Sequence, residues 1–557
     1  MAFLWLDINA SWSHSSLALP ALHANLEPEV SARCNMQVVR GTIKSNPSQI
    51  VDEVLCCNPS FIFATAWLFN VEYLKQILCR VHSIMPSVQI FLGGPEFLGN
   101  NEEFLRSCRY VTAVFKGEGE DIFNPFITSL LNNDDSWKEL PGFEWIEDYA
   151  YKASQAVAVK DFPALHNPME SSLFSWDKSF VQIETSRGCF NSCRFCVSGI
   201  DKSKVQDIPV HQLRSLLQKV ADKGIREVRI LDRTFNANPL RALELINLFG
   251  EFAGKLNFHL EIHPALLHCV SDSSPVAKLR EALANVPDGL LHLGAGIQTL
   301  QQDVLDSCAR KGSCANAVEG LKFLIGCKKF EVHADLIAGL PGYTFDNLVD
   351  DTMQLMQIGP GEIQLELLKL LPGTHFRIAC GEYGIKHSPV TPYEVLQTPS
   401  VSYRELNMSM VLSRALDLWY NDSKWREPFG KIFTGSRDLL MSLIDWLFKG
   451  DLVSQPLSLE GRGMLLYRFC REFAPQYCPL VSLQWVRNGL SMKKEPAESF
   501  VKWEIRDTQT TNPLFVEGDP RYKYHYIDIE SARHWFSFNK EIERIAPCGY
   551  AVEELAL

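Results

Sequence analysis

Three cysteines fall within eight positions of one short stretch, RGCFNSCRFC at residues 187–196. They are Cys189, Cys193 and Cys196. Three thiolates on a [4Fe–4S] cluster leave the fourth iron without a protein ligand, so that iron can bind a small chelating molecule. A structural zinc site instead needs four ligands, and no fourth Cys or His lies close by in the sequence. The stretch therefore favours an iron–sulfur cluster. The alternatives are a zinc site completed by a remote residue, or three plain buried thiols.

The spacing C-x-x-x-C-x-aromatic-C, with Phe195 before the last cysteine, resembles the signature of the radical S-adenosylmethionine (radical SAM) enzymes. The resemblance implies that the open iron binds the amino and carboxylate groups of S-adenosylmethionine (SAM). It also implies that an electron from the cluster cleaves SAM to methionine and a 5′-deoxyadenosyl radical, which abstracts hydrogen from substrate. The protein then supplies binding and orientation. An electron donor such as flavodoxin or ferredoxin is the implied partner.

Two later segments resemble SAM-binding motifs of that family, in the expected order. They are residues 296–310, which resemble the fourth-strand region, and DLIAGLPG at 335–342, which resembles the fifth-strand motif. The resemblance implies SAM contacts from Phe195, Glu261, Gln298, Arg310 and Gly339. Two plainer interpretations stay open, since the glycines around Pro341 are also typical of a turn and Gln298 of a strand end.

The Gly-Gly-Glu that usually follows the second strand in this family is absent, and LDRTFNAN (231–238) stands in its place. Asp232-x-x-Phe235 at this point is typical of the cobalamin-binding branch. The N-terminal region resembles the cobalamin-binding domain of that branch at residues 6–22, 91–97 and 114–120. The implied cobalamin contacts are Ser13, His14, Trp67, Gly93, Gly94, Gly117 and Glu118. A Rossmann-like scaffold that binds nothing is the alternative, and the missing G-x-G-x-x-G disfavours a dinucleotide.

The motif D-x-H-x-x-G, whose histidine coordinates cobalt from below in many cobalamin proteins, does not occur in this chain. We therefore expect no histidine as lower ligand through that motif. Trp67 or Phe69 is expected near the lower face of the cobalamin. A second three-cysteine set, as in RNA methylthiotransferases, is disfavoured because the N-terminal cysteines are spread over several elements.

Short apolar runs alternate with amphipathic stretches over the first 130 residues, which predicts an α/β domain with a parallel, doubly wound sheet. The predicted strands are residues 2–8, 36–41, 61–67, 88–94 and 111–117. From residue 179 the alternation resumes, and six strand–helix units predict a partial (β/α)6 barrel of the TIM type. The predicted strands there are residues 180–185, 227–232, 258–264, 290–298, 330–342 and 362–373. Ligands of both architectures bind at the carboxyl ends of the strands.

Four segments are expected along the chain. They are a Rossmann-like cobalamin-binding domain at 1–135, a linker at 136–178, the radical SAM partial barrel at 179–385 and a mostly helical C-terminal domain at 386–557. The last of these resembles an uncharacterised extension found on some cobalamin-type radical enzymes. We expect it to close the barrel mouth or to shape access to it.

Composition is that of a globular enzyme, with 557 residues, 46% apolar and 22% charged. A net charge of -12 disfavours broad binding to nucleic acid. No apolar run approaches the ~20 residues that cross a bilayer, and the first ten residues indicate a buried strand rather than a signal peptide. The 16 cysteines form no disulfide framework. We therefore expect a cytoplasmic protein without membrane attachment.

These observations favour a cobalamin-dependent radical SAM enzyme, most of all a methyltransferase acting on an unactivated carbon of a small-molecule or peptide substrate. A cyclisation or oxidation that uses the same cofactors without methyl transfer is the alternative within enzymes. A non-catalytic cobalamin or redox sensor is the alternative outside them.

Overall fold

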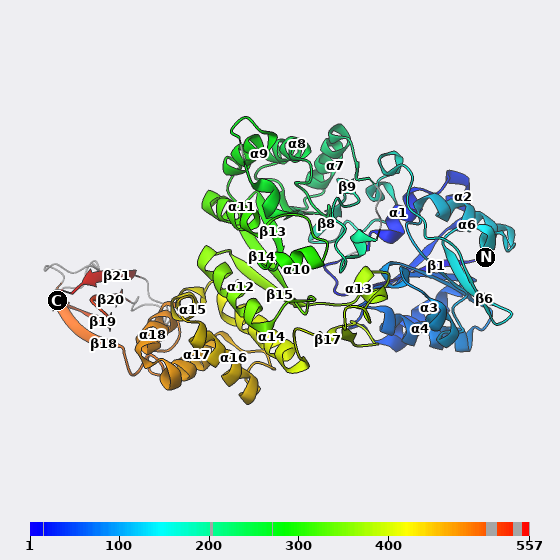
Figure 1. The fold of residues 1–557 in the computed structure, drawn as a ribbon. Helices are drawn as coiled ribbons and strands as arrows, with labels where there is room; N and C mark the ends of the chain where they lie inside the picture. The colour runs from blue at the N-terminus through cyan, green and yellow to red at the C-terminus, as the bar shows by residue number, and fades with distance from the viewer. Residues whose placement is uncertain (15, 201–203, 270, 508–520, 538–548, 556–557) are drawn as a thin grey trace. The chain divides into compact units, whose positions relative to one another are not determined.

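The computed structural model describes residues 1–557 except 15, 201–203, 270, 508–520, 538–548 and 556–557. The chain folds as two compact units, and many of its helices and strands are labelled in Figure 1. The first unit holds Met1–Val332, Gly339–Tyr343 and Leu367–Ser402, and the second holds His333–Ala338, Thr344–Glu366 and Tyr403–Leu557. Among the described residues, no helix combines the length and apolar character that a bilayer span requires.

The N-terminal part of the first unit is a seven-stranded sheet. Its order is β2 (Gln37–Thr42), β1 (Phe3–Asn9), β3 (Phe61–Thr65), β4 (Gln89–Gly93), β5 (Ala113–Phe115), β6 (Phe143–Glu147) and β7 (Ala150–Ala153). The first five strands pair in parallel, and β6 and β7 add an antiparallel edge inside the stretch predicted to be a linker. Its helices are α1 (Ala18–Ala24), α2 (Pro28–Cys34), α3 (Pro47–Cys57), α4 (Val71–Ile84), α5 (Glu102–Ser107) and α6 (Glu120–Asn132).

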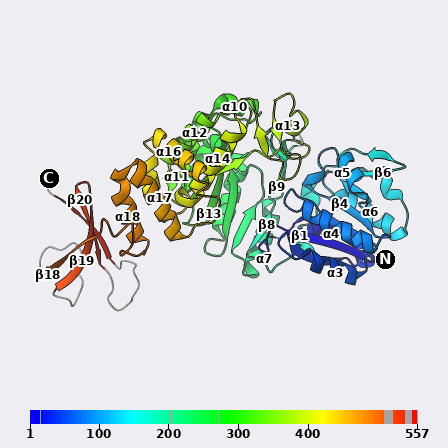
Figure 2. The same cartoon turned by 90° about the horizontal axis from the view of Figure 1, so that it is seen from below.

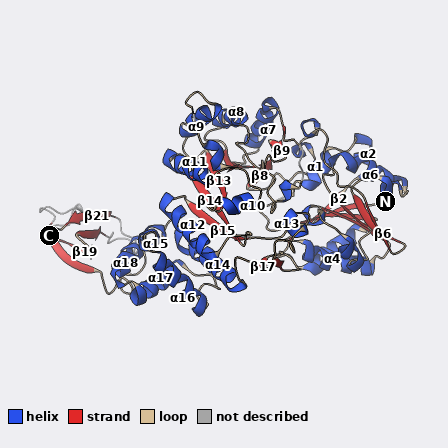
Figure 3. Cartoon of the chain, viewed as in Figure 1, coloured by secondary structure: helices blue, strands red, loops and turns tan. Residues whose placement is uncertain are grey.

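Alternation along the strands gives the two faces of this sheet different cores. Leu4 and Leu6 of β1 point into an aliphatic cluster that α3 and α4 complete. Phe3 and Trp5 of the same strand point into an aromatic cluster shared with α6. Because successive side chains of a strand face opposite sides, a continuous apolar run such as FLWL buries both faces. The predicted doubly wound domain is confirmed, and helices flank its strands in Figure 3.

The second sheet has six strands, in the order β15 (Glu362–Leu367), β14 (Glu331–Ala338), β13 (Leu291–Gln298), β12 (Asn257–Ile262), β11 (Glu227–Ile230) and β8 (Phe180–Ile183). Strands β8, β11, β12 and β13 pair in parallel. The connecting helices are α7 (Val210–Asp222), α8 (Pro239–Gly250), α9 (Pro275–Ala284), α10 (Gln302–Ser307), α11 (Cys314–Cys327) and α12 (Phe345–Ile358). Strands β15 and β8 are the two ends of the order, so the predicted partial barrel is confirmed as an open sheet.

The first unit ends with a segment of short elements after β15. They are α13 (His375–Ile378), β16 (Lys386–His387) and β17 (Val395–Gln397), of which the two strands pair antiparallel. This segment, Leu367–Ser402, belongs to the same compact unit as the N-terminal sheet and most of the barrel strands.

The second unit is mostly helical, as predicted. Its helices after residue 402 are α14 (Tyr403–Ala415), a π-helical turn (Leu416–Tyr420), α15 (Arg426–Phe433), α16 (Arg437–Gly450), α17 (Leu459–Phe473) and α18 (Cys478–Arg487). Trp419, Trp425 and Trp485 are fully buried among them and form the core. A four-stranded antiparallel sheet follows, part of it labelled in Figure 2: β18 (Lys502–Asp507), β19 (Arg521–Ile529), β20 (Ala532–Ser537) and β21 (Gly549–Glu554).

Candidate functional site

The cysteine loop begins where β8 ends, at the carboxyl edge of the barrel sheet. Cys193 is buried, with 6% of its surface exposed, whereas Cys189 and Cys196 are partly exposed. Burial raises the pKa of the Cys193 thiol, and the Arg310 guanidinium, 3.9 Å from its sulfur, acts in the opposite direction. The Cys196 N–H donates to the Cys193 carbonyl at 3.1 Å, so these two ligand candidates lie in one tight turn. Phe195, predicted as a SAM contact, is partly exposed between two of them.

Asp232 fixes the entry to this loop. Its carboxylate accepts hydrogen bonds from the backbone N–H groups of Thr185 and Ser186, at 2.7 and 2.9 Å on Oδ1. The hydroxyls of the same two residues donate to Oδ2, at 2.5 and 2.8 Å. Burial raises the pKa of Asp232, and these four hydrogen bonds act against that rise. From the sequence, Asp232 was only a marker of the cobalamin-binding branch; the structure shows that it holds the end of β8.

A second anchor comes from the segment after α10. The backbone N–H of Lys311 donates to Asn191 Oδ1 at 3.0 Å, inside the cysteine loop. Arg310 donates to the Gly296 carbonyl on β13 and also reaches Cys193. Arg310 therefore connects the inner strand β13 to the cluster loop, which is compatible with its predicted place near SAM.

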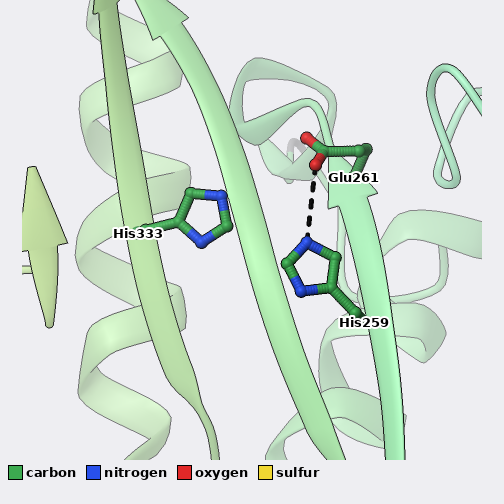
Figure 4. A group of neighbouring side chains, drawn as sticks. All are labelled: His259, Glu261 and His333. Atoms are coloured by element: carbon green, nitrogen blue, oxygen red, sulfur yellow. Dashed lines mark ion pairs between the residues drawn. The ribbon is translucent and has the colours of Figure 1, made fainter. Parts of the chain in front are cut away.

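The other predicted SAM contacts lie at or near the carboxyl ends of the strands. On β12, Phe258 is buried against α8, and alternation turns His259 and Glu261 to the opposite face. Glu261 forms an ion pair with His259 at 3.6 Å (Figure 4). Gln298 is the last residue of β13 and has a positive φ of 71°. Gly339, with φ of 88°, directly follows β14.

A cavity of about 640 Å³ joins the N-terminal domain to the cluster loop within the first unit. Predicted cobalamin contacts that line it are Trp67, Gly93, Gly94, Gly117 and Glu118. The cluster loop contributes Arg187, Gly188, Val197 and Ser198. The cavity therefore begins at the carboxyl ends of β3, β4 and β5 and continues to the residues that flank the cysteines.

Ser13 and His14 do not occur among the described residues that line this cavity. The His14 Nδ1 atom lies 2.8 Å from the Ser11 hydroxyl and 3.2 Å from the Ser13 hydroxyl. The His14 ring also meets the edge of Phe180 of β8, with centroids 5.3 Å apart. The structure thus places these two residues in a polar loop that contacts the barrel, outside the group that lines the cavity.

Two glycines are needed where the backbone forms the cavity wall. Gly94 has φ of 108°, and a Cβ on it would lie 2.6 Å from the Ala66 carbonyl oxygen. Gly117 has φ of 115°, and its Cβ would lie 2.2 Å from the Val157 carbonyl oxygen. L-residues avoid such φ values, and these contacts leave no room for a side chain. Bare backbone therefore faces the cavity at both positions.

Arg187 is a residue of this site that the sequence interpretation missed. It contacts Glu120 at 2.8 Å, Glu184 at 2.6 Å and Glu118 at 3.7 Å. Its guanidinium also stacks on the Phe162 ring at 4.3 Å. Burial lowers the pKa of Arg187, but the three carboxylates outweigh burial and raise it overall. Its position two residues before Cys189 could have drawn attention to it, and Glu184 is only three positions away. The other partners, Glu118, Glu120 and Phe162, lie too far along the chain for a local pattern to reveal them.

Parts of the chain are similar to known protein families and proteins. Residues 183–355 match the radical SAM superfamily, and residues 381–474 match a protein of unknown function (DUF4080). The cobalamin-dependent radical SAM methyltransferase TokK of Streptomyces tokunonensis is 22% identical over 349 residues, covering 60% of this chain and 51% of TokK. The uncharacterized methyltransferase PH0819 of Pyrococcus horikoshii is 24% identical over 312 residues, covering 52% of this chain and 63% of that protein. The chain thus spans less than two thirds of these relatives.

Two solved structures share the fold. The cobalamin-dependent radical enzyme OxsB, with aqua-cobalamin bound, has a TM-score of 0.60 at 14% identity, covering 87% of this chain and 79% of OxsB. The radical SAM methyltransferase TsrM from Kitasatospora setae, with cobalamin and a [4Fe–4S] cluster bound, has a TM-score of 0.52 at 14% identity, covering 70% and 76%.

A three-cysteine loop at the carboxyl edge of an open parallel sheet, preceded by a doubly wound domain, defines the architecture of a radical SAM enzyme with an N-terminal cofactor domain. Residues 183–355 match the radical SAM superfamily, and the chain shares the fold of cobalamin-dependent radical SAM enzymes, in agreement with the resemblance seen in the sequence. The roles of the individual site residues stay predictions.

Replacing Asp232 tests the clamp on β8. Asp232→Ala leaves two backbone N–H groups and two hydroxyls without their acceptor, and we expect a loss of about 3 kcal/mol in the free energy of unfolding. Asp232→Asn is the matched control, because its oxygen can accept from both N–H groups while the hydroxyls rotate to accept from its NH2. Urea unfolding and iron content after anaerobic reconstitution measure both effects. If both variants lost the same unfolding free energy and the same iron content, these hydrogen bonds would not be what holds the end of β8.

His263, which follows β12, tests the pH dependence of the same region. Burial lowers its pKa from 6.5 to about 4, and its Nε2–H donates to the Lys311 carbonyl at 3.0 Å. His263 in the unfolded chain therefore binds a proton at a higher pH than in the folded protein. As a result, the free energy of unfolding falls as pH drops from about 6.5 toward 4. Between about pH 7 and pH 5 this histidine should cost about 2 kcal/mol of unfolding free energy. His263→Gln keeps an N–H donor but does not titrate, so its unfolding free energy should fall by about 2 kcal/mol less than that of the unaltered protein over this pH range in urea titrations. If the two proteins lost the same unfolding free energy, His263 would not be the titrating group.

Proposed function

We propose that this protein is a cobalamin-dependent radical SAM enzyme that transfers a methyl group to an unactivated carbon of a small-molecule or peptide substrate. One observation supports this most directly: a single cavity is lined both by the N-terminal domain and by residues that flank the three cysteines. Methyl transfer needs a methyl carrier and a radical source that reach the same substrate carbon. The similarity to TokK, named a methyltransferase, points the same way.

The residues present fit both cofactors. Three thiols in one loop, one buried and two partly exposed, are the donor set of a [4Fe–4S] cluster with one open iron. Backbone exposed at Gly94 and Gly117 suits a large, flat ligand that needs close approach. When bound, the cluster supplies the electron that cleaves SAM to a 5′-deoxyadenosyl radical, and cobalamin supplies the methyl carrier.

The chain's own residues bind and orient these groups. The cluster would be held by Cys189, Cys193 and Cys196. Arg310 would fix Cys193 relative to β13, because it contacts both the Cys193 sulfur and a β13 carbonyl. We assign SAM contacts to five residues of the cluster loop, of the carboxyl ends of neighbouring strands and of the segment after α10: Phe195, Glu261, Gln298, Gly339 and Arg310. We assign cobalamin contacts to Trp67, Gly93, Gly94, Gly117 and Glu118, which share the cavity wall.

The cellular setting is part of the proposal. We infer a cytoplasmic enzyme that receives electrons from a flavodoxin or ferredoxin. We also retain the division into 1–135, 136–178, 179–385 and 386–557, although β6 and β7 of the second segment add two strands to the N-terminal sheet.

Removal of the cluster ligands is the first test. Replacing Cys189, Cys193 and Cys196 together by Ala should abolish reductive cleavage of SAM, because no thiolate remains to hold the cluster. The 5′-deoxyadenosine formed under dithionite, with iron and sulfide content, measures this. Replacing Cys56, Cys57 and Cys79 of the N-terminal domain is the matched control and should leave cleavage intact. Cleavage that survives loss of the first set would exclude the radical scheme.

Filling the cavity tests the cobalamin site separately. A Cβ on Gly93 meets only Phe115 atoms at 3.9 Å, so Gly93→Leu should fold and project into the cavity. We expect cobalamin affinity to fall at least about tenfold, the effect of roughly 1.4 kcal/mol, while iron content is unchanged. Gly326→Leu, on an exposed part of α11 with nothing nearby, is the control. Cobalamin binding that tolerates Gly93→Leu, measured by absorbance after gel filtration, would place the cofactor elsewhere.

A further inference from the structure

We propose that the segment after β15, residues 370–393, positions the two cofactor-binding loops relative to one another. In this assignment Tyr393 acts on the loop after β4, and Tyr383 acts on the cysteine loop. Both are positioning residues, and neither needs to touch a cofactor. The inference rests on the proposed function for what the loops hold, although the contacts themselves are those of the described structure.

The first contact joins Tyr393 to the predicted cobalamin side. Tyr393 Oη donates a hydrogen bond to the carboxylate of Glu96, of which only 9% is exposed. Glu96 lies in the helical turn Pro95–Phe97, directly after the glycines that line the cavity. Burial raises the pKa of Glu96, and the Tyr393 hydrogen bond opposes that rise. The Arg377 guanidinium stacks on the Tyr393 ring at 4.6 Å and so fixes the tyrosine from its own segment.

The second contact involves backbone and meets both loops at once. A Cβ on Gly373, whose φ is 78°, would lie 2.6 Å from the Leu98 carbonyl oxygen and 3.1 Å from Ile200 Cδ1. Leu98 and Ile200 both line the cavity, one from the loop after β4 and the other from the turn after the cysteines. A Cβ on Gly99 would in turn lie 3.2 Å from the Gly373 nitrogen. Gly373 is thus the point where the two cofactor loops meet the same segment.

The third contact joins the segment to the cysteines. Arg194, between Cys193 and Cys196, donates from Nη1 to Tyr383 Oη at 2.7 Å. The carbonyl oxygen of Arg194 accepts from the Phe376 N–H at 3.0 Å. The rings of Phe376 and Tyr383 pack edge to face, with centroids 4.9 Å apart. One short segment therefore holds the backbone and the side chain of the residue that separates two predicted cluster ligands.

The segment overlaps the start of the region that matches the protein of unknown function DUF4080, and these contacts suggest what that start does. That match begins at residue 381, so it includes both tyrosines. Loops that follow strands have little structure of their own, and the relative position of two such loops depends on what ties them together. A segment that contacts both can set how far the methyl carrier lies from the radical source.

The test compares three single-hydroxyl deletions in the full-length chain, reconstituted with iron, sulfide and cobalamin. Tyr393→Phe should raise the cobalamin dissociation constant about fivefold, roughly one hydrogen bond, with SAM cleavage close to that of the unaltered protein. Tyr383→Phe should lower 5′-deoxyadenosine formation about fivefold and change the EPR signal of the reduced cluster, with cobalamin affinity unchanged. Tyr149→Phe, 84% exposed, is the control and should change neither. Glu96→Gln keeps an acceptor for Tyr393 and should retain cobalamin affinity.

Hydrogen exchange provides a readout that does not depend on cofactor chemistry. Tyr393→Phe should speed amide exchange in residues 95–99 and leave residues 190–199 unchanged, whereas Tyr383→Phe should do the reverse. This separation would support the positioning role even if the chain bound no cobalamin, in which case the proposed function alone would fail. If each variant lost amide protection in both loops and unfolded at a lower midpoint, the segment would contribute only to overall stability, and the inference would be overturned. Unchanged exchange in both would overturn it as well.

Discussion

The carboxylate of Asp232 is the contact on which the geometry of the site depends. A buried charge without partners costs several kcal/mol, and here two backbone N–H groups and two hydroxyls offset that cost. The donors are Thr185 and Ser186, just after β8, while Asp232 follows the neighbouring strand β11. The interaction therefore ties two adjacent strand ends together. Cys189 lies four positions beyond Thr185, so this link fixes the backbone shortly before the first thiol.

Ion pairs of Arg187 connect the N-terminal domain to the cysteine loop at the cavity wall. One guanidinium faces Glu118, Glu120 and Glu184, an arrangement with excess negative charge if all three are ionised. Burial raises the pKa of Glu118, while the hydrogen bond from the Val159 N–H and the charge of Arg187 act against that rise. Two of these carboxylates belong to the N-terminal domain and one precedes the cysteine loop. A single buried cation therefore joins both sides of the cavity, at a cost in desolvation that its partners offset.

Much of this architecture could be predicted from local patterns. Apolar runs such as residues 2–8 gave the strands, and three closely spaced cysteines gave the cluster chemistry, because both signals lie within a few residues. The functional meaning of Asp232 could not be predicted in this way, since its partners are 46 and 47 positions away. Ser13 and His14 were chosen for cobalamin by resemblance, and this stays a prediction; they contact one another beside Phe180 and are not among the described residues that line the cavity. Strands β6 and β7 lie in a polar stretch whose composition indicated a linker.

Long-range contacts decide what the C-terminal part of the first unit does. Glu96 and Tyr393 are 297 positions apart, and Arg194 and Tyr383 are 189 apart, so no periodicity or motif connects them. In a barrel whose sheet stays open, nothing in the strand order itself closes the edge beside the last strand. The segment that follows β15 turns back instead onto the loops of two earlier strands. Those loops carry the predicted ligands of two different cofactors, so the segment contacts both sides of the proposed site, although the sequence alone placed a domain boundary inside it.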